Sequence, residues 1–191
     1  MKPLIYLFLC TVFLMALGHQ TINAKQFAYE EGISIGADIS GNIPTGDAGD
    51  EFKTSIGFNA RLNYFLVRQI AIGISLGYLN WGFKNAGTGD FTFYMIPILA
   101  TFQYYLIMEA SLRLYIGLGA GPWLLHDKFS FQGFEQSNSE TKYGIKPMIG
   151  VMFPLAAAIM LNASLSYPII FTDNKNFTYL RVALGIMYSL Q

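Results

Sequence analysis

Large apolar residues recur at every second position in eight segments of this chain. From Ile56 to Tyr64, for example, apolar side chains occupy the even positions, while glycine, asparagine and arginine occupy the odd ones. A period of two places the two sets on opposite faces of a β-strand. The pattern therefore predicts eight strands with one uncharged apolar face each, whose apolar sets begin at Ile33, Ile56, Ile70, Tyr94, Leu112, Tyr143, Leu161 and Leu180.

Aromatic residues mark the two ends of these apolar sets. Tyr94 and Tyr104 are ten residues apart, as are Tyr143 and Phe153. Ten residues of a tilted strand climb roughly 25 Å, the height of the lipid-facing band of a transmembrane barrel, and aromatic rings are stable at both of its interfaces. We expect a periplasmic girdle of Tyr29, Tyr64, Tyr104, Phe153 and Tyr188, and an outer girdle of Tyr78, Tyr94, Tyr143 and Tyr167.

The face opposite the apolar one carries glycine, hydroxyl, amide and charged residues. A soluble ligand-binding barrel shows the reverse arrangement, with its polar residues outside. The sequence is therefore predicted to be all-β and to form one eight-stranded, antiparallel, up-and-down transmembrane β-barrel over residues 25–191.

Two uncharged segments, Phe91–Met108 and Pro147–Phe171, are long enough to cross a membrane as helices. The intact period of two and the interrupting prolines, Pro97, Pro154 and Pro168, favour strands instead. Because proline lacks the N–H that a strand ladder needs, we expect bulges at Pro97 and Pro147.

The connections between the segments alternate in length. Short ones fall near Leu66–Gln69, Ile107–Ala110 and Pro154–Ala156. Longer polar ones fall near Gly41–Lys53, Gly82–Asp90, Leu125–Lys142 and Thr172–Asn176. Short periplasmic turns and long outer loops are typical of outer-membrane barrels, so both termini are expected in the periplasm.

Composition narrows the class of protein further. Only 13% of the residues are charged, the formal net charge is zero and no basic cluster is present, so nucleic acid is not an expected partner. Met1–Ala24 has the lysine, apolar stretch and small-residue end of a secretory signal peptide. Cys10, the single cysteine, lies inside it, so the mature chain is expected to contain no thiol and to reside in the bacterial outer membrane.

Four charged residues are predicted to lie inside the barrel: Asp38, Arg61, Arg113 and Arg181. Asp38 and Arg181 belong to the first and last strands at a similar height, so we expect them to form an ion pair where the barrel closes. An unpaired charge in a dry interior is strongly unfavourable, and the four residues are therefore interpreted as a structural polar cluster. An openable gate or narrow pore is the alternative, although eight strands leave little room beyond the side chains.

Five methionines are also predicted to point inward, together with Trp81, Tyr115 and Trp123. Methionine adapts to irregular apolar shapes, so these side chains could line a pocket for an acyl chain. Such residues more often fill a core, and that interpretation is favoured. The five are Met95, Met148, Met152, Met160 and Met187.

His126, the single histidine after the predicted signal segment, is followed by Asp127 and Ser130. A lipid-modifying hydrolase needs these residue types held together, but polar residues are also expected at the start of the longest loop. No catalytic or cofactor-binding residue is predicted. No metal site is predicted either, because the acids of the first long loop are interpreted as solvated: Asp47, Asp50 and Glu51.

Three short motifs carry a resemblance to a known superfamily: Ile43-Pro44-Thr45-Gly46-Asp47, Leu76-Gly77-Tyr78 before a loop, and the glycine-rich run from Leu114 to Gly121. With them, the whole mature chain resembles the small outer-membrane β-barrel superfamily of OmpA-, OmpX- and OmpW-like proteins. The resemblance implies the fold and says little about function. Family members often end on an aromatic residue that the assembly machinery reads, whereas this chain ends Tyr188-Ser189-Leu190-Gln191.

The sequence leaves three functions open. The first is a non-enzymatic structural and surface-presentation role through the outer loops, chiefly Leu125–Lys142 with Phe129, Phe131, Phe134 and Glu135. The second is binding or passage of a small apolar molecule through the methionine-lined interior, as in OmpW-like proteins. The third is lipid modification at His126. The expected partners are outer-membrane lipid, lipopolysaccharide and, during biogenesis, the assembly machinery, with a monomeric chain and no cofactor.

Overall fold

The computed structural model describes residues 32–84, 90–109, 111–131, 134–156, 158–173 and 175–190. The signal peptide predicted at Met1–Ala24 and Tyr29 of the predicted periplasmic girdle lie outside the described residues. So do the side chains of five residues discussed above: Phe129, Ser130, Phe131, Phe134 and Glu135. Predictions that concern them stay predictions.

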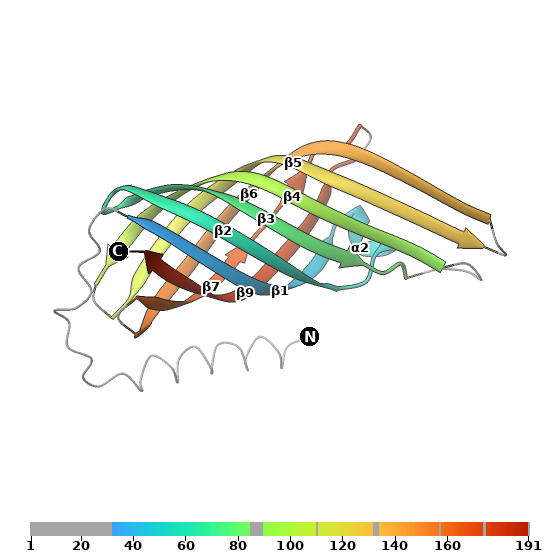
Figure 1. Cartoon of the computed structure of the whole chain (residues 1–191). Helices are drawn as coiled ribbons and strands as arrows, with labels where there is room; N and C mark the ends of the chain where they lie inside the picture. Colours follow the sequence, from blue (N-terminus) through green and yellow to red (C-terminus); the bar gives the residue numbers. More distant parts are fainter. Residues whose placement is uncertain are drawn as a thin grey trace.

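The described residues form nine strands and one short helix (Figure 1). The strands are β1 (Ile33–Thr45), β2 (Ser55–Val67), β3 (Ile70–Trp81), β4 (Asp90–Met108), β5 (Arg113–Phe131), β6 (Phe134–Ala156), β7 (Ile159–Ser166), β8 (Ile169–Ile170) and β9 (Phe177–Leu190). The helix α2 (Asp47–Glu51) connects β1 to β2.

The strands close into a ring of eight antiparallel positions. Each strand from β1 to β6 pairs with the next along the chain, and β9 pairs with both β7 and β1. Strands β7 and β8 occupy one position of the ring, because both lie between β6 and β9 and are separated by Tyr167 and Pro168. Pro168 has no N–H to continue the ladder, which explains the interruption. The predicted eight-stranded antiparallel barrel is confirmed.

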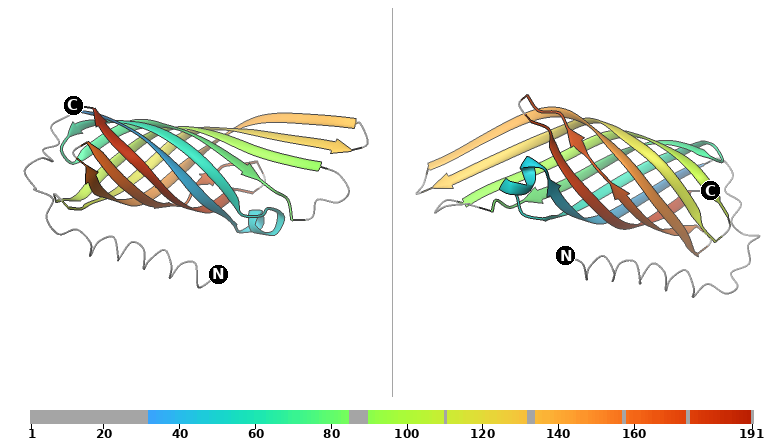
Figure 2. Two further views of the ribbon diagram at one scale, coloured as in Figure 1. Left: turned by 60° about the horizontal axis from the view of Figure 1, so that its bottom comes forward. Right: turned by 180° about the vertical axis from the view of Figure 1, so that it is seen from behind.

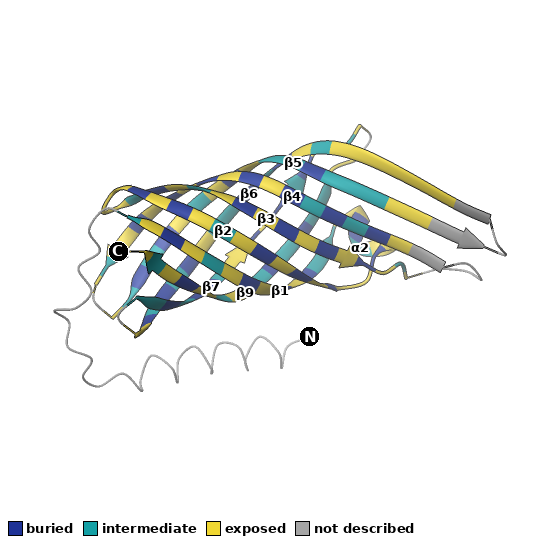
Figure 3. Ribbon diagram, viewed as in Figure 1, coloured by how far each residue is buried: buried dark blue, intermediate teal, exposed yellow. Residues whose placement is uncertain are grey.

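Exposure alternates along the strands (Figure 3). Ile56 and Phe58 are 63% and 59% exposed, whereas Asn59 is 7% exposed. The apolar set therefore lies on the outside of the barrel and the polar set inside, as the period of two predicts. Most of the described aromatic residues at the ends of the apolar sets are exposed as well, for example Tyr143 at 66%.

Both ends of the barrel chain lie where the short turns are (Figures 1 and 2). Ile33, the first residue of β1, pairs with Leu190, the last residue of β9. The same end carries the turns from β2 to β3, from β4 to β5 and from β6 to β7. The opposite end, called the outer end below, carries α2 and the longer connections. This agrees with the predicted alternation of connection lengths.

The bulges predicted at Pro97 and Pro147 are wrong. The register of β4 is the same on both sides of Pro97, and the pairing of β5 with β6 runs unbroken through Pro147. Gly77 makes room for the Pro97 ring, since a Cβ at Gly77 would lie 2.8 Å from its Cγ. The Pro147 carbonyl accepts a hydrogen bond from the Tyr167 N–H, so the backbone of Pro147 faces the gap between β7 and β8. The N–H that proline lacks would point the same way, and its absence therefore costs no hydrogen bond to β5.

The two uncharged segments that could have formed helices are strands. Phe91–Met108 lies within β4, and Pro147–Phe171 covers the end of β6 with β7 and β8. No helix among the described residues is long and apolar enough to span a membrane.

Strands β4, β5 and β6 continue past the rest of the barrel at the outer end (Figure 2). Pairing of β5 with β6 reaches Phe131 opposite Phe134, whereas β6 pairs with β8 no further than Gly144. We call the sheet of residues 90–96, 123–131 and 134–143 the ribbon; its base at Phe93–Met95 still pairs with β3, and the strands project beyond that base. The loop predicted at Leu125–Lys142 is therefore wrong, because its described residues are the paired ends of β5 and β6. On β6, every residue from Gln136 to Thr141 is exposed, so polar residues occupy both faces there and the composition resembles that of a loop.

Candidate functional site

The barrel interior is filled by three layers of side chains. An outer apolar cluster contains Ala48, Phe52, Leu79, Trp81, Phe93, Met95, Leu99, Trp123, Ile170 and Tyr179. An inner apolar cluster near the short turns contains Phe65, Ala71, Tyr105, Tyr115, Met152, Met160 and Met187. Between them lies a charged layer of Asp38, Arg61, Lys146 and Arg181.

The connection from β1 to β2 folds over the outer cluster. It turns at Gly46, whose φ of 60° suits glycine, and then forms α2. Ala48 and Phe52 are buried beneath it at 6% and 7% exposure. Phe52 and Phe83 form an isolated β-bridge. Beside it, the Lys53 N–H donates to the Gly82 carbonyl at 2.7 Å and the Lys84 N–H donates to the Glu51 carbonyl at 2.9 Å. These bonds connect the β1–β2 segment to the β3–β4 segment. Because the Phe52 ring also lies 5.1 Å from that of Phe93, the outer end is sealed by aromatic packing.

Asp38 is the centre of the charged layer. Arg61 donates to Asp38 Oδ2 and Arg181 to Asp38 Oδ1, and Asn59 Nδ2 donates to Oδ2 at 3.1 Å. The Asp38 side chain is 1% exposed and both arginine side chains are 8% exposed. Arg181 lies opposite Asn42, four residues closer to the outer end than Asp38, so its side chain reaches back to the carboxylate. The expected neighbours Asp38 and Arg181 are thus in contact, and Arg61 joins them.

The remaining interior cations lie at different heights. Arg113 is 5% exposed and faces Met152 near the inner cluster, so the structure does not bring it to Asp38. Lys146 is also 5% exposed and lies within the field of Asp38, Arg61 and Arg181. Lys146 is not one of the four interior charges predicted from the sequence. Lys146 lies in this layer because the strand register places it opposite Gly119. The sequence does not encode that register directly.

The five inward methionines do not share one pocket. Met95 belongs to the outer cluster, and the other four lie in or against the inner cluster: Met148, Met152, Met160 and Met187. The charged layer separates the two groups. Within the described interior, the cavity beside the charged layer has a volume of about 10 Å³, room for a single small occupant.

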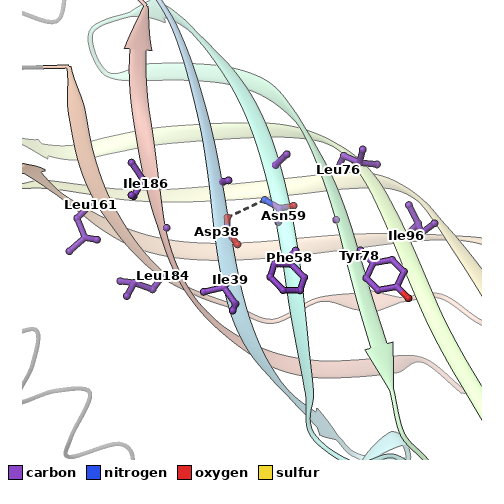
Figure 4. Close-up of a pocket in the computed structure, with 14 residues that line it drawn as sticks. Asp38, Ile39, Phe58, Asn59, Leu76, Tyr78, Ile96, Leu161, Leu184 and Ile186 are labelled. Carbon is purple, nitrogen blue, oxygen red and sulfur yellow. Dashed lines mark hydrogen bonds between the residues drawn. The ribbon is translucent and has the colours of Figure 1, made fainter.

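A larger apolar groove, of about 830 Å³, lies on the outside of the barrel (Figure 4). Its floor is formed by Ala37 and Ala60, which face each other on β1 and β2. Larger outward side chains surround this floor, including Phe58, Leu76 and Ile186. The groove is therefore a depression in the apolar outer surface.

His126 lies on the ribbon rather than in a loop. Its ring stacks on Tyr94 with 4.8 Å between centroids, and its Nδ1 shares a hydrogen bond of 2.7 Å with the Ser139 hydroxyl. Asp127 follows it on the strand and therefore projects from the opposite face. The carboxylate that the hydrolase hypothesis needs is thus not beside the imidazole, and the Ser130 side chain lies outside the described residues.

The base of the ribbon carries a group of ion pairs in which the two acids are exposed and Lys142 is half-buried. Lys142 lies 2.5 Å from Glu140 and 2.6 Å from Asp173, which follows β8. The hydrogen bond with Asp173 raises the pKa of the Lys142 ammonium and lowers the pKa of the Asp173 carboxyl. These contacts connect β6 to the segment between β8 and β9.

The acids predicted to be solvated lie on α2, where Asp47, Asp50 and Glu51 are exposed. Within the described part of the chain, no group of three or more histidine, cysteine, aspartate or glutamate side chains could hold a metal ion.

The sequence matches the family model described as "Outer membrane protein beta-barrel domain" over residues 9–189. Among curated proteins, none matches the chain.

Similar solved structures include Neisserial surface protein A, with 19% identity and a TM-score of 0.64, over 83% of this chain and 97% of that one. Ail, the attachment invasion locus protein of Yersinia pestis, has 22% identity and a TM-score of 0.59, over 84% and 100%. The outer membrane protein OprG from Pseudomonas aeruginosa has 14% identity and a TM-score of 0.55, over 84% and 96%. At these identities the likeness shows the fold.

Proposed function

The chain belongs to the outer membrane protein beta-barrel domain family, and we propose that it is a non-enzymatic surface protein whose ribbon contacts proteins outside the cell. The family and the fold place the barrel in the bacterial outer membrane. The observation that carries the proposal is the ribbon itself. Strand β6 has 23 residues, and roughly ten are enough to cross the bilayer, so much of it projects beyond the membrane.

The outer edge of the ribbon offers backbone groups for pairing. The carbonyls of Tyr143 and Pro147 accept hydrogen bonds from the N–H groups of Phe171 and Tyr167, which flank β8. Odd-numbered residues of β6 therefore direct their backbone groups away from β5. Beyond Tyr143, the described residues provide no strand on that side. The N–H and C=O groups of Ser137, Ser139 and Thr141 therefore face solvent. An open strand edge is a template for an extended segment of another protein.

Lipopolysaccharide is the proposed lipid neighbour at the outer end. Five lysines lie there, and the exposed ones present compact charges suited to phosphate groups. They are Lys53, Lys84, Lys128, Lys142 and Lys175. We further propose a monomeric barrel inserted by the outer-membrane assembly machinery.

The other two functions find less support. An apolar molecule passing through the interior would have to cross the sealed aromatic cluster and the buried Asp38 ion pairs. Lipid hydrolysis at His126 would need a carboxylate beside the ring, and Asp127 projects from the other face of the strand.

Cysteine labelling of intact cells tests the presentation of the ribbon. Ser137→Cys should react with a membrane-impermeant maleimide on whole cells, whereas Gln69→Cys in a short turn should react after the outer membrane is permeabilised. The absence of other thiols predicted for the mature chain makes the label specific. Reaction of Gln69→Cys alone on intact cells would reverse the orientation and contradict the proposal.

A proline substitution tests edge pairing. Ser137→Pro removes an outward N–H but no bond to β5, while Ser137→Ala keeps the N–H and removes only the hydroxyl. Attachment of cells to immobilised extracellular proteins should fall in the first variant and persist in the second. Equal attachment by both variants would show that the edge does not take part.

A further inference from the structure

The charged layer contains more positive than negative charge. Arg61 and Arg181 share the one carboxylate of Asp38, and Lys146 adds a third cation to the layer. All other acidic side chains that the structure describes are exposed: Asp47, Asp50, Glu51, Glu109, Asp127, Glu140 and Asp173. A buried excess of charge is strongly unfavourable unless a counter-charge compensates it.

Lys146 is the cation that lacks a protein partner. Although it is 5% exposed, it forms no ion pair or hydrogen bond with any described residue. Its stem packs over Gly119, since a Cβ at Gly119 would lie 3.4 Å from Lys146 Cε. Arg61 and Arg181 each donate to one carboxylate oxygen of Asp38. The Lys146 ammonium is therefore repelled by two guanidinium groups as well as attracted by the carboxylate.

The small interior cavity lies against this ammonium. Lys146 and Arg181 line it together with Ser40, Asn59 and Tyr179. Trp123 also lines it, and the buried Trp123 Nε1 has no hydrogen-bond partner among the described residues. The surrounding polar side-chain groups are an ammonium, a guanidinium, an indole N–H, two hydroxyls and the Asn59 amide. Each can donate a hydrogen bond, and no carboxylate lines the cavity.

We propose that this cavity binds one small monovalent anion of the halide class, held by Lys146 and Arg181. A water molecule could accept hydrogen bonds from the same donors but would leave the excess positive charge uncompensated. A halide accepts those bonds and supplies the missing negative charge. The apolar clusters on both sides exclude bulk water, so the electrostatic attraction is little screened.

A halide-dependent unfolding experiment tests the site. Protein purified from outer membranes in detergent is unfolded by urea in sodium bromide or in sodium gluconate at equal ionic strength. A ligand that binds the folded state alone raises its stability in a saturable manner, so the urea midpoint should rise with bromide and then reach a plateau. The rise should be absent in Lys146→Met and retained in Lys142→Met, which alters a lysine of the same strand that lies outside the charged layer.

Two results would overturn the proposal. One is a wild-type midpoint that does not depend on bromide, which would indicate a neutral lysine or a bound water molecule. The other is an equal bromide effect in wild type and Lys146→Met, which would indicate a general salt effect. If Lys146→Met does not fold, anomalous scattering from wild-type crystals grown in bromide decides instead. A peak beside Lys146 Nζ supports the site, and its absence rejects it.

Discussion

The ring of Tyr115 on β5 lies across Gly150, the residue directly opposite it on β6. Beyond Gly150, the Tyr115 hydroxyl donates a hydrogen bond of 2.9 Å to Asn162 Oδ1 on β7. One buried side chain therefore connects three adjacent strands. The contact requires glycine at position 150, because any side chain there would occupy the space of the ring.

Gly150→Ala should destabilise the barrel by about 1–3 kcal/mol, the usual range for overpacking a filled interior. The new methyl group overlaps the Tyr115 ring, which must leave its position and lose the bond to Asn162. Urea unfolding in detergent measures the change. Gly41→Ala is the matched control, since a Cβ at Gly41 meets nothing within 4 Å. Equal effects of the two substitutions would show that the ring does not depend on Gly150.

Asp38→Asn should cost about 3–5 kcal/mol of stability, because it leaves two buried guanidinium groups without their carboxylate. Adding Arg181→Leu should recover part of that loss, since the second change removes one of the stranded charges. The double-mutant cycle, measured by urea unfolding, should therefore be strongly non-additive. Additive losses would mean that Arg181 is not coupled to Asp38.

The sequence predicts the barrel well because membrane barrels obey a strict period of two. Lipid outside and close packing inside leave each side chain only two environments, so the outward positions from Ile33 to Leu190 can be assigned from alternation alone. Relations between strands are harder to predict. Whether Lys146 or Arg113 lies at the height of Asp38 depends on register, and register depends on where each turn begins.

The ribbon and the methionines show the same limit. Polar strands outside the membrane have no buried face to impose alternation, so Gln136–Lys142 could not be distinguished from a loop. The methionine side chains lie in or against two interior clusters, and their division between the clusters depends on height along the barrel axis. The bulges predicted at Pro97 and Pro147 were wrong for a local reason. Gly77 leaves space for the Pro97 ring, and the gap beside Pro168 lies where the Pro147 N–H would have been needed.

Lys142→Gln should return the pKa of Asp173 upward to its ordinary value, because the hydrogen bond from Lys142 is the main cause of its depression. A carboxyl with a lowered folded pKa stabilises the folded state above its unfolded pKa, and that contribution is lost as pH falls through the folded pKa. Carboxyl titration by NMR measures the shift. Glu140→Gln is the control, because it leaves the Lys142–Asp173 pair in place. An unchanged Asp173 titration in Lys142→Gln would disprove the contact.

Amide exchange along β6 should alternate in the ribbon and not in the barrel. The N–H groups of Ser137, Ser139 and Thr141 face away from β5 and should exchange quickly, whereas those of Gln136, Asn138 and Glu140 pair with β5 and should be slow. Ile145 has the same parity as the fast group but pairs with Ile169 of β8, so its amide should be protected. Hydrogen exchange by NMR on the detergent-solubilised protein resolves these amides individually. Protection of Ser137 and Ser139 in the isolated protein would mean that the edge is already covered, and strand addition by a partner would then have no free site.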